Sequence, residues 1–409
     1  MTEIARSPGW GAARTGVAAP AHAAQPGPRA APPIRLFRPD PDVPPAWDDL
    51  LDATPVGAGR LARDVQLGLE ATERVLDGHL RAGRAAAEAL APGYGALWAA
   101  LRGQVGGKML RPRLTLAAYL GLGGVDVDGI APVAAAQELL HTAMVVHDDV
   151  LDHDEVRRGR PNLAGVRRAE LAAVGITGKA AEDQVLAAAL LGGDLALTGA
   201  FDLVARAPIA PELRLGAVQL LVRAVTTTVG GELLDVAAEL HLPTNVDALL
   251  IAELKTAAYT CSGPLMVGAL LAGADGTTRA QLDRLGIALG VAFQLVDDEL
   301  GIFGDPAQTG KSVLSDIREG KRTELLRLSY LLADNAGRAV LDQHVGRPDL
   351  DDDDAALVRA VISGSGALDR TRAVALGAAR TARETAQLLP APLADYLCAL
   401  IDELAGRDS

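Results

Sequence analysis

The sequence predicts an all-α protein, a single large bundle of helices packed around a central cavity. Of the 409 residues, 49% are hydrophobic but only 3% are aromatic, so Ala, Leu and Val must build most of the core. Ala and Leu are strong helix formers. Alternating apolar and polar patterns, which predict strands, are scarce, and the apolar texture runs almost unbroken from about Asp48 onward.

The first 45 residues differ from the rest of the chain. They are rich in Pro, Ala and Gly, a composition that does not form a packed core. We therefore expect a disordered tail over residues 1–45 and one domain over residues 46–409. No apolar run reaches the length of a membrane span, so none is expected.

Charge and cysteine content narrow the class of protein further. The formal net charge of −13 disfavours nucleic-acid binding, which requires basic patches. Cys261 and Cys398 each lie in an apolar run, so we expect buried free thiols and a cytoplasmic location. An acidic run within residues 346–354 lacks accompanying site-forming residues and predicts a solvated loop or a helix start. The Gly-containing segment 172–183 predicts another loop.

The first candidate site follows an apolar run without Gly or Pro, residues 135–147, which predicts a buried helix. Asp148, Asp149 and Asp152 come at its end. On a helix Asp148 and Asp152 share a face one turn apart, and Asp149 lies to the side. His141 lies two turns before Asp148 on the same face, which favours ligand contact over the usual role of a satisfied core histidine.

A second acidic pair, Asp297 and Asp298, ends a similar apolar run over residues 285–300. Gln294 lies three and four residues earlier and can face the same site. Either pair alone is equally well explained as a solvated helix end. Two such pairs indicate carboxylates held around cations, because burying several acids without one would be costly. Hard oxygen ligands favour Mg²⁺, with more than one ion bridging the carboxylates to substrate phosphates.

Cations accompany both clusters. The doubled arginine Arg157-Arg158 follows the first, and arginines grip phosphate oxygens through charge-assisted hydrogen bonds. An earlier loop places Lys108 and Arg111 beside a Gly pair, which lets the backbone approach a ligand closely. Lys311 follows the second cluster, but the spacing of its glycines and the preceding helix exclude a nucleotide-binding P-loop.

Together these motifs resemble those of the trans-isoprenyl diphosphate synthases, the polyprenyl synthetase family, over about residues 97–325. The matching motifs are Gly-Gly-Lys-x-x-Arg-Pro at 106–112, Asp-Asp-x-x-Asp at 148–152, Arg-Arg-Gly at 157–159, Lys-Thr at 255–256, Phe-Gln-x-x-Asp-Asp at 293–298, Gly-Lys-Ser at 310–312 and Asp-Ile-Arg-Glu-Gly-Lys-Arg at 316–322. The resemblance implies a bundle of the isoprenoid synthase type, a homodimer, and Mg²⁺-dependent condensation of isopentenyl diphosphate with an allylic diphosphate.

The resemblance also implies a role for each candidate residue. The Mg²⁺ ligands would be Asp148, Asp149, Asp152, Asp297 and Asp298. Isopentenyl diphosphate would contact Lys108, Arg111, His141 and Arg158. The allylic diphosphate would contact Arg157, Lys255, Thr256, Gln294 and Lys311. His147 receives no role.

Two positions bear on product length. In the family, the residues five and four places before the first cluster help to set pocket depth, and here they are Ala143 and Met144. An aromatic residue there would stop the growing tail early. Alanine predicts a product beyond C15, with C20 favoured and longer polyprenyl chains left open.

Three positions depart from the family pattern, and two other functions compete. Met109 stands where Arg is frequent, Gly301 where a third Asp often ends the second motif, and Glu232 where Gln is usual. A terpene cyclase would need no isopentenyl diphosphate site and would carry an Asn-Asp-x-x-Ser-x-x-x-Glu pattern, which the chain lacks. A non-catalytic partner subunit tends to lose an aspartate motif, whereas this chain keeps the first intact and most of the second.

Overall fold

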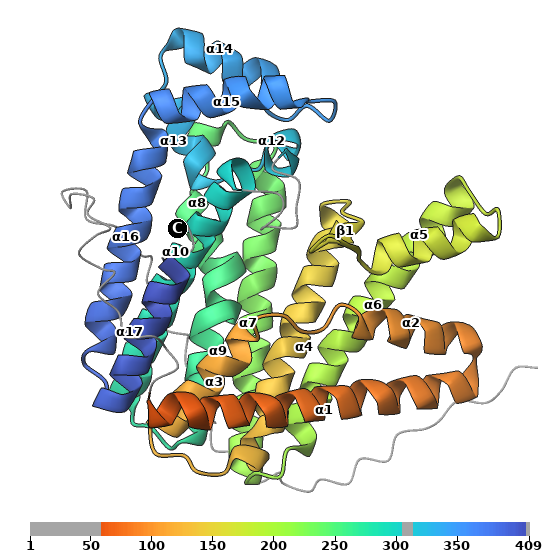
Figure 1. Ribbon diagram of the computed structural model, residues 1–409, viewed down its shortest axis with the longest axis vertical. Helices are drawn as coiled ribbons and strands as arrows, with labels where there is room; N and C mark the ends of the chain where they lie inside the picture. Colours follow the sequence, from red (N-terminus) through yellow and green to blue (C-terminus); the bar gives the residue numbers. More distant parts are fainter. Residues whose placement is uncertain (1–58, 305–313, 406–409) are drawn as a thin grey trace, which may run out of the picture. The chain divides into compact units, whose positions relative to one another are not determined.

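Helices account for almost all of the secondary structure in the computed structural model, which describes residues 59–304 and 314–405 (Figure 1). The expected tail, residues 1–45, lies outside the described residues. In chain order the elements are α1 (Arg60–Leu90), α2 (Pro92–Arg102), α3 (Leu110–Gly121), α4 (Val127–Leu151), β1 (Val156–Arg157), β2 (Arg160–Pro161), α5 (Leu163–Ala173), α6 (Lys179–Arg206), α7 (Pro211–Ala238), η1 (Pro243–Asn245), α8 (Ala248–Ile251), η2 (Ala252–Ser262), α9 (Gly263–Leu271), α10 (Gly276–Phe303), α12 (Ser315–Glu319), α13 (Glu324–Leu332), α14 (Asn335–His344), α15 (Asp352–Gly364), α16 (Ala367–Ala386) and α17 (Ala391–Ala405).

Aspartates fix the start of several of these helices. Asp126, Asp275 and Asp351 precede α4, α10 and α15, and each side chain accepts a hydrogen bond from the backbone N–H three residues later, at 2.7 to 2.9 Å. Such caps satisfy a donor that the helix itself leaves unpaired. The acidic run at 346–354 is therefore the start of a helix, as the sequence predicts.

The central helix is α4, which packs against α1, α3 and α6 (Figure 1). Small residues bring α4 and α6 close together: a Cβ added at Gly193 would lie 2.2 Å from the His147 ring, and one at Gly199 would lie 3.1 Å from Leu139. In a core that is poor in aromatic residues, small side chains thus let the helices approach closely.

The segment η2 is a π-helix that lies between α7 and α10. Its backbone is approached from both sides by glycines. A Cβ at Gly231 of α7 would lie 2.2 Å from the backbone nitrogen of Lys255, and one at Gly290 of α10 would lie 2.4 Å from the Cα of Ala257. π-Helical turns are rare and concentrate at functional sites. Functional side chains are therefore expected on η2.

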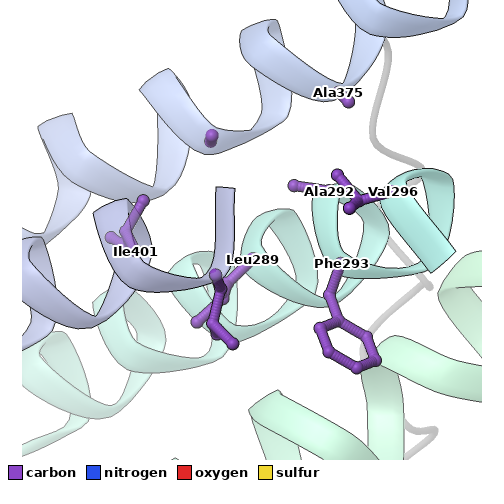
Figure 2. Close-up of a pocket in the computed structure, with 8 residues that line it drawn as sticks. Leu289, Ala292, Phe293, Val296, Ala375 and Ile401 are labelled. Carbon is purple, nitrogen blue, oxygen red and sulfur yellow. The ribbon is translucent and has the colours of Figure 1, made fainter. Parts of the chain in front are cut away.

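The helix α10 is held by its apolar face. A small cavity of about 10 Å³ lies between this face, which includes Leu289, Phe293 and Val296, and helices α16 and α17. Figure 2 shows the residues that line it. The polar residues Gln294 and Asp298 occupy other sides of the same helix. A second apolar core lies beyond the C-terminal end of α10 and unites α12 to α16 through residues such as Ile302, Ile317 and Leu325.

The prediction of a loop over residues 172–183 is wrong at both ends. Helix α5 continues to Ala173 and α6 begins at Lys179, so the connection spans residues 174–178. Charges support the start of α6: Lys179 pairs with Asp183 at 3.0 Å, one turn later.

Two described helices have the length and composition to cross a membrane, α4 and α6. The apolar window of α4 is 78% buried, so α4 is the core helix of the bundle, whereas that of α6 is 39% buried. Part of the apolar surface of α6 is therefore exposed, including Leu186, Leu190 and Leu191.

Candidate functional site

The C-terminal end of α4 carries the first acidic cluster. Asp148 and Asp149 lie in the last turn and Asp152 caps the helix. A helix C-terminus carries partial negative charge, so acids at this end are unfavourable unless cations lie nearby. Each of these aspartates faces a Lys or Arg side chain, and the three cations involved come from three different segments of the chain.

Lys255 of η2 is the cation next to Asp148. Its Nζ lies 2.9 Å from Asp148, 2.7 Å from Asp235 and 3.1 Å from Glu232, the last two on α7. Burial lowers the pKa of Lys255, but the three acids outweigh burial and raise that pKa above its ordinary value. At Asp148 burial acts in the other direction and raises the pKa, yet Lys255 and Lys321 outweigh it and hold the pKa of Asp148 below its ordinary value.

At Glu232, the residue that replaces the family's Gln, the effect of burial is larger than that of the neighbouring lysine. Burial raises the pKa of Glu232 to about 6, Lys255 opposes this shift, and Asp148 adds to it. One lysine thus faces three carboxylates. This surplus of negative charge is what a divalent cation offsets, and the donor set consists of the hard oxygens that Mg²⁺ prefers.

Asp149 and Asp152 have separate partners. Asp149 is only 4% exposed and accepts hydrogen bonds from Arg157 Nε at 2.7 Å and Asn162 Nδ2 at 2.9 Å. Burial raises the pKa of Asp149, and Arg157 opposes the shift. Asp152 accepts from Lys321 Nζ at 2.7 Å. Asp149 therefore faces the arginine, to the side of Asp148, as the helical period predicts.

The second cluster is tied to η2. Thr256 donates to Gln294 at 2.6 Å, and Gln294 donates to Asp298 at 2.7 Å. Burial raises the pKa of Asp298 well above its ordinary value. The hydrogen bond from Gln294 opposes this rise, and the charge of nearby Asp316 adds to it. Asp297 is exposed. Within residues 59–304 and 314–405, no three His, Cys, Asp or Glu side chains converge on one point as a preformed metal site. The acids of the first cluster turn toward their cations instead.

The predicted basic site forms around Tyr259, which sequence reasoning missed. Arg111 lies 4.8 Å over the Tyr259 ring and donates to Thr260 at 2.7 Å. His141 also contacts this tyrosine, with its Nδ1 3.5 Å from the Tyr259 hydroxyl. Burial, together with Arg111 and Arg158, holds the pKa of His141 well below its ordinary value, so the imidazole is neutral.

Arg158 completes the basic site. Its guanidinium donates to the Gly106 carbonyl, and a Cβ at Gly107 would lie 2.6 Å from its Nη1, so the glycine pair makes room for it. Lys108 is exposed on the same loop. Met109 is 6% exposed with φ of 50° and begins α3, so the loop turns tightly without the arginine that is frequent in the family.

The doubled arginine is divided between the two sites. Arg157 reaches the acidic cluster, whereas Arg158 reaches the glycine loop. The cause is a two-residue hairpin between β1 and β2, in which Arg158 and Gly159 have φ of 52° and 68°. Both positive values are typical of a type I′ turn, which turns successive side chains to different sides. Non-glycine residues rarely adopt this conformation, and they do so most often at functional sites.

Three predicted residues remain: Ala143, Met144 and Lys311. Ala143 is fully buried, and Met144 is half-buried against the core. Lys311 lies outside the described residues. Sequence reasoning missed Asn162, Tyr259 and Lys321 as site residues; only Lys321 gave a signal, as part of the basic motif at 316–322.

Comparisons with known proteins agree with this geometry. The sequence pattern of the family "Polyprenyl synthetase" matches residues 99–362. A geranylfarnesyl diphosphate synthase of Aeropyrum pernix is 33% identical over 74% of this chain and 91% of its own length. A (2E,6E)-farnesyl diphosphate synthase of Mycobacterium bovis is 35% identical over 64% and 68%. A geranylgeranyl pyrophosphate synthase of Corynebacterium glutamicum, solved with isoprenyl diphosphate and magnesium, superposes with a TM-score of 0.77 at 30% identity, over 84% and 98%.

Glu232→Gln should stabilise the protein at neutral pH. The pKa of Glu232 is raised on folding, so its ionisation costs stability fully above about pH 6 and not below the ordinary pKa of 4.5. We expect the variant to gain about 1 kcal/mol of unfolding free energy near pH ~7.5, and the gain to shrink by more than half near pH ~5.

Denaturant unfolding at both pH values, without Mg²⁺ or diphosphate, measures this difference. Glu239→Gln, an exposed acid at the end of the same helix, is the matched control and should change little at either pH. A loss of stability in Glu232→Gln near neutral pH would mean that its ion pair with Lys255 outweighs the cost of burial.

Proposed function

The chain belongs to the polyprenyl synthetase family and is a prenyltransferase, and from this premise we propose that it condenses isopentenyl diphosphate with an allylic diphosphate in the presence of Mg²⁺. The observation that carries the proposal is the division of Arg157 and Arg158 between an acidic cluster and a basic loop. Two neighbouring sites of opposite charge match two diphosphates, one bound through Mg²⁺ and one bound directly by cations.

The acidic site is proposed to bind the allylic diphosphate. Asp148, Asp152 and the second-cluster pair Asp297 and Asp298 would hold Mg²⁺. Asp149 would also belong to the set, although its contacts with Arg157 and Asn162 favour a role in orienting the arginine. The diphosphate would contact Arg157, Lys255, Thr256, Gln294 and Lys311. When bound, Mg²⁺ supplies electrostatic stabilisation of the departing diphosphate.

This chain's own cations complete that stabilisation. Arg157 and Lys255 face Asp148 in the absence of substrate, and a diphosphate with its metal ions would compete for the same charges. They would then neutralise the diphosphate as the allylic C–O bond breaks. The apolar lining of the bundle would keep water from the resulting carbocation.

The basic site is proposed to bind isopentenyl diphosphate through Lys108, Arg111, His141 and Arg158. A neutral His141 donates one hydrogen bond without adding charge, and the stack with Tyr259 fixes the plane of its ring. The double bond of isopentenyl diphosphate would attack the allylic carbon, a C–C bond would form, and a proton would leave to the departed diphosphate. Glu138, 2% exposed, lies beside this site: burial raises its pKa, and the charges of Arg111 and Arg158 oppose that shift.

The proposed product is geranylgeranyl diphosphate, C20. Its support is the pair Ala143 and Met144, one small and one flexible residue below the first cluster. Farnesyl and geranylfarnesyl diphosphate synthases are among the similar proteins, so a C15 or a longer product is the alternative. The terpene cyclase is disfavoured because it has no use for the second, basic site.

We also propose a homodimer through α6 and α7, which pack against each other. The exposed face of α7 carries apolar residues at a strict seven-residue spacing: Leu215, Val222, Val229 and Val236. Leu186, Leu190 and Leu191 of α6 are 47 to 53% exposed. A repeat of this kind fits a second helix of the same repeat, and a copy of this chain supplies one. The two free cysteines favour a cytoplasmic location.

Asp148→Asn should lower turnover by at least about 100-fold, which corresponds to about 3 kcal/mol of transition-state stabilisation. Asp353→Asn, in the exposed acidic run of α15, should change it by less than about twofold. Product formation from an allylic diphosphate, isopentenyl diphosphate and Mg²⁺ measures both. Equal effects would mean that the metal site is elsewhere, and a cyclised hydrocarbon made without isopentenyl diphosphate would favour the cyclase.

Arg157→Lys and Arg158→Lys should separate the two substrates. Both variants keep the charge but lose the bidentate geometry. The first should raise the KM for the allylic diphosphate about tenfold, and the second that for isopentenyl diphosphate, each with little effect on the other constant. Steady-state kinetics with each substrate varied in turn give both constants. Parallel increases would contradict the assignment of the two arginines to two sites.

Ala143→Phe should shorten the main product to C15 or below, because the ring would fill the path of the tail below the aspartates. The position is fully buried, so a stability cost of ~1–3 kcal/mol accompanies the change. Mass spectrometry of the products, together with thermal unfolding, separates the two effects. Met144→Ala is the matched control that removes side-chain volume instead of adding it, and it should leave the product equally long or longer. A folded Ala143→Phe variant with unchanged product length would contradict this role.

A further inference from the structure

The second aspartate cluster lacks an acid at residue 301, and the structure supplies one from another helix. A Cβ added at Gly301 of α10 would lie 1.9 Å from Oδ2 and 2.9 Å from Cγ of Asp316 in α12. The carboxylate of Asp316 thus fills the space into which any side chain at residue 301 would extend. Gly301 is four residues after Asp297 and three after Asp298, so this space adjoins the side of α10 that carries the pair.

The position of Asp316 is fixed by its surroundings. Ile317 is 2% exposed in the second apolar core, and its carbonyl accepts from Gly346 at 2.8 Å. Arg318 donates to the Leu350 carbonyl at 2.7 Å. These contacts anchor α12 immediately after Asp316, which holds the carboxylate against α10 as part of a packed structure.

The charges around Asp316 belong to both acidic clusters. Asp316 is one of the acids that raise the pKa of Asp298, and it also raises that of Lys321, whose Nζ reaches Asp152 of the first cluster. The Asp316 carbonyl accepts from the Lys321 backbone N–H at 3.2 Å, so the acid and the lysine share one short segment. The segment 316–321 therefore joins the second cluster to the first.

We propose that Asp316 is the third carboxylate of the second aspartate cluster, taking the place that Gly301 leaves open on α10, and that it helps to bind the Mg²⁺–diphosphate complex. This proposal rests on the proposed function and deepens it. It also gives Gly301 a purpose, because a side chain at that position would displace Asp316 and α12 with it.

An exchange of the two residues tests the proposal. Gly301→Asp, which restores the family pattern, should lower turnover at least about tenfold, since the two side chains need the same space. Asp316→Gly alone should also lower it. The double variant Gly301→Asp/Asp316→Gly returns one carboxylate to one space and should recover most of the activity, a strong non-additivity between neighbours. Additive losses in the double variant would overturn the proposal, and so would full activity in Gly301→Asp.

A binding measurement provides a second test that needs no turnover. Calorimetric titration of inorganic diphosphate with Mg²⁺ into Asp316→Asn should give an affinity at least about tenfold weaker than that of the unchanged protein. The amide keeps the shape of the carboxylate, so the melting temperature should stay close to that of the unchanged protein. Glu384→Gln, an exposed acid on α16, is the control and should bind normally.

The two tests separate this proposal from the proposed function. Equal binding by Asp316→Asn and the unchanged protein would overturn the role of Asp316, even if the enzyme elongates allylic diphosphates as proposed. Weakened binding in Asp316→Asn would support the role of Asp316 even if the product were not the expected one.

Discussion

The site depends on carboxylates held at the C-terminal end of a buried helix. The dipole of α4 and the loss of solvent both oppose negative charge at Asp148 and Asp149. The protein offsets this cost with cations from three segments: the hairpin that follows α4, and the more distant η2 and segment after α12. Because Lys255 faces three acids at once, the balance stays negative. The same imbalance that limits stability would attract Mg²⁺ and the diphosphate that it carries, as proposed for this site.

The shape of η2 determines which side chains take part. Lys255 contacts the acids of α4 and α7, whereas Tyr259 and Thr260 contact Arg111, so this one segment contributes to both sites. Glycines on α7 and α10 permit this geometry, since any Cβ at Gly231 or Gly290 would meet the backbone of η2. Residues without chemistry of their own therefore position both sites.

The sequence predicted those parts of the site that follow from short-range order. Asp148, Asp149 and Asp152 lie as a helical period requires, and Arg157 and Arg158 are near the cluster because a short hairpin follows it. Contacts across long chain separations were not predictable. Lys321 meets Asp152 across 169 residues and Arg111 meets Thr260 across 149, and no local pattern encodes either. Tyr259 was missed because the π-helix has no recognised pattern, and Asp316 because Gly301 looked like a loss.

The hairpin has a further consequence, since it connects the two sites through adjacent residues. Arg157 and Arg158 share one short stretch of backbone: the turn between β1 and β2 is two residues long, and Asn162 ties its base to Asp149. A diphosphate that draws Arg157 away from Asp149 would therefore also shift Arg158 against the glycine loop. Occupation of the acidic site would in this way alter the basic site without any large motion of the bundle, and the coupling would act in both directions because linkage is reciprocal.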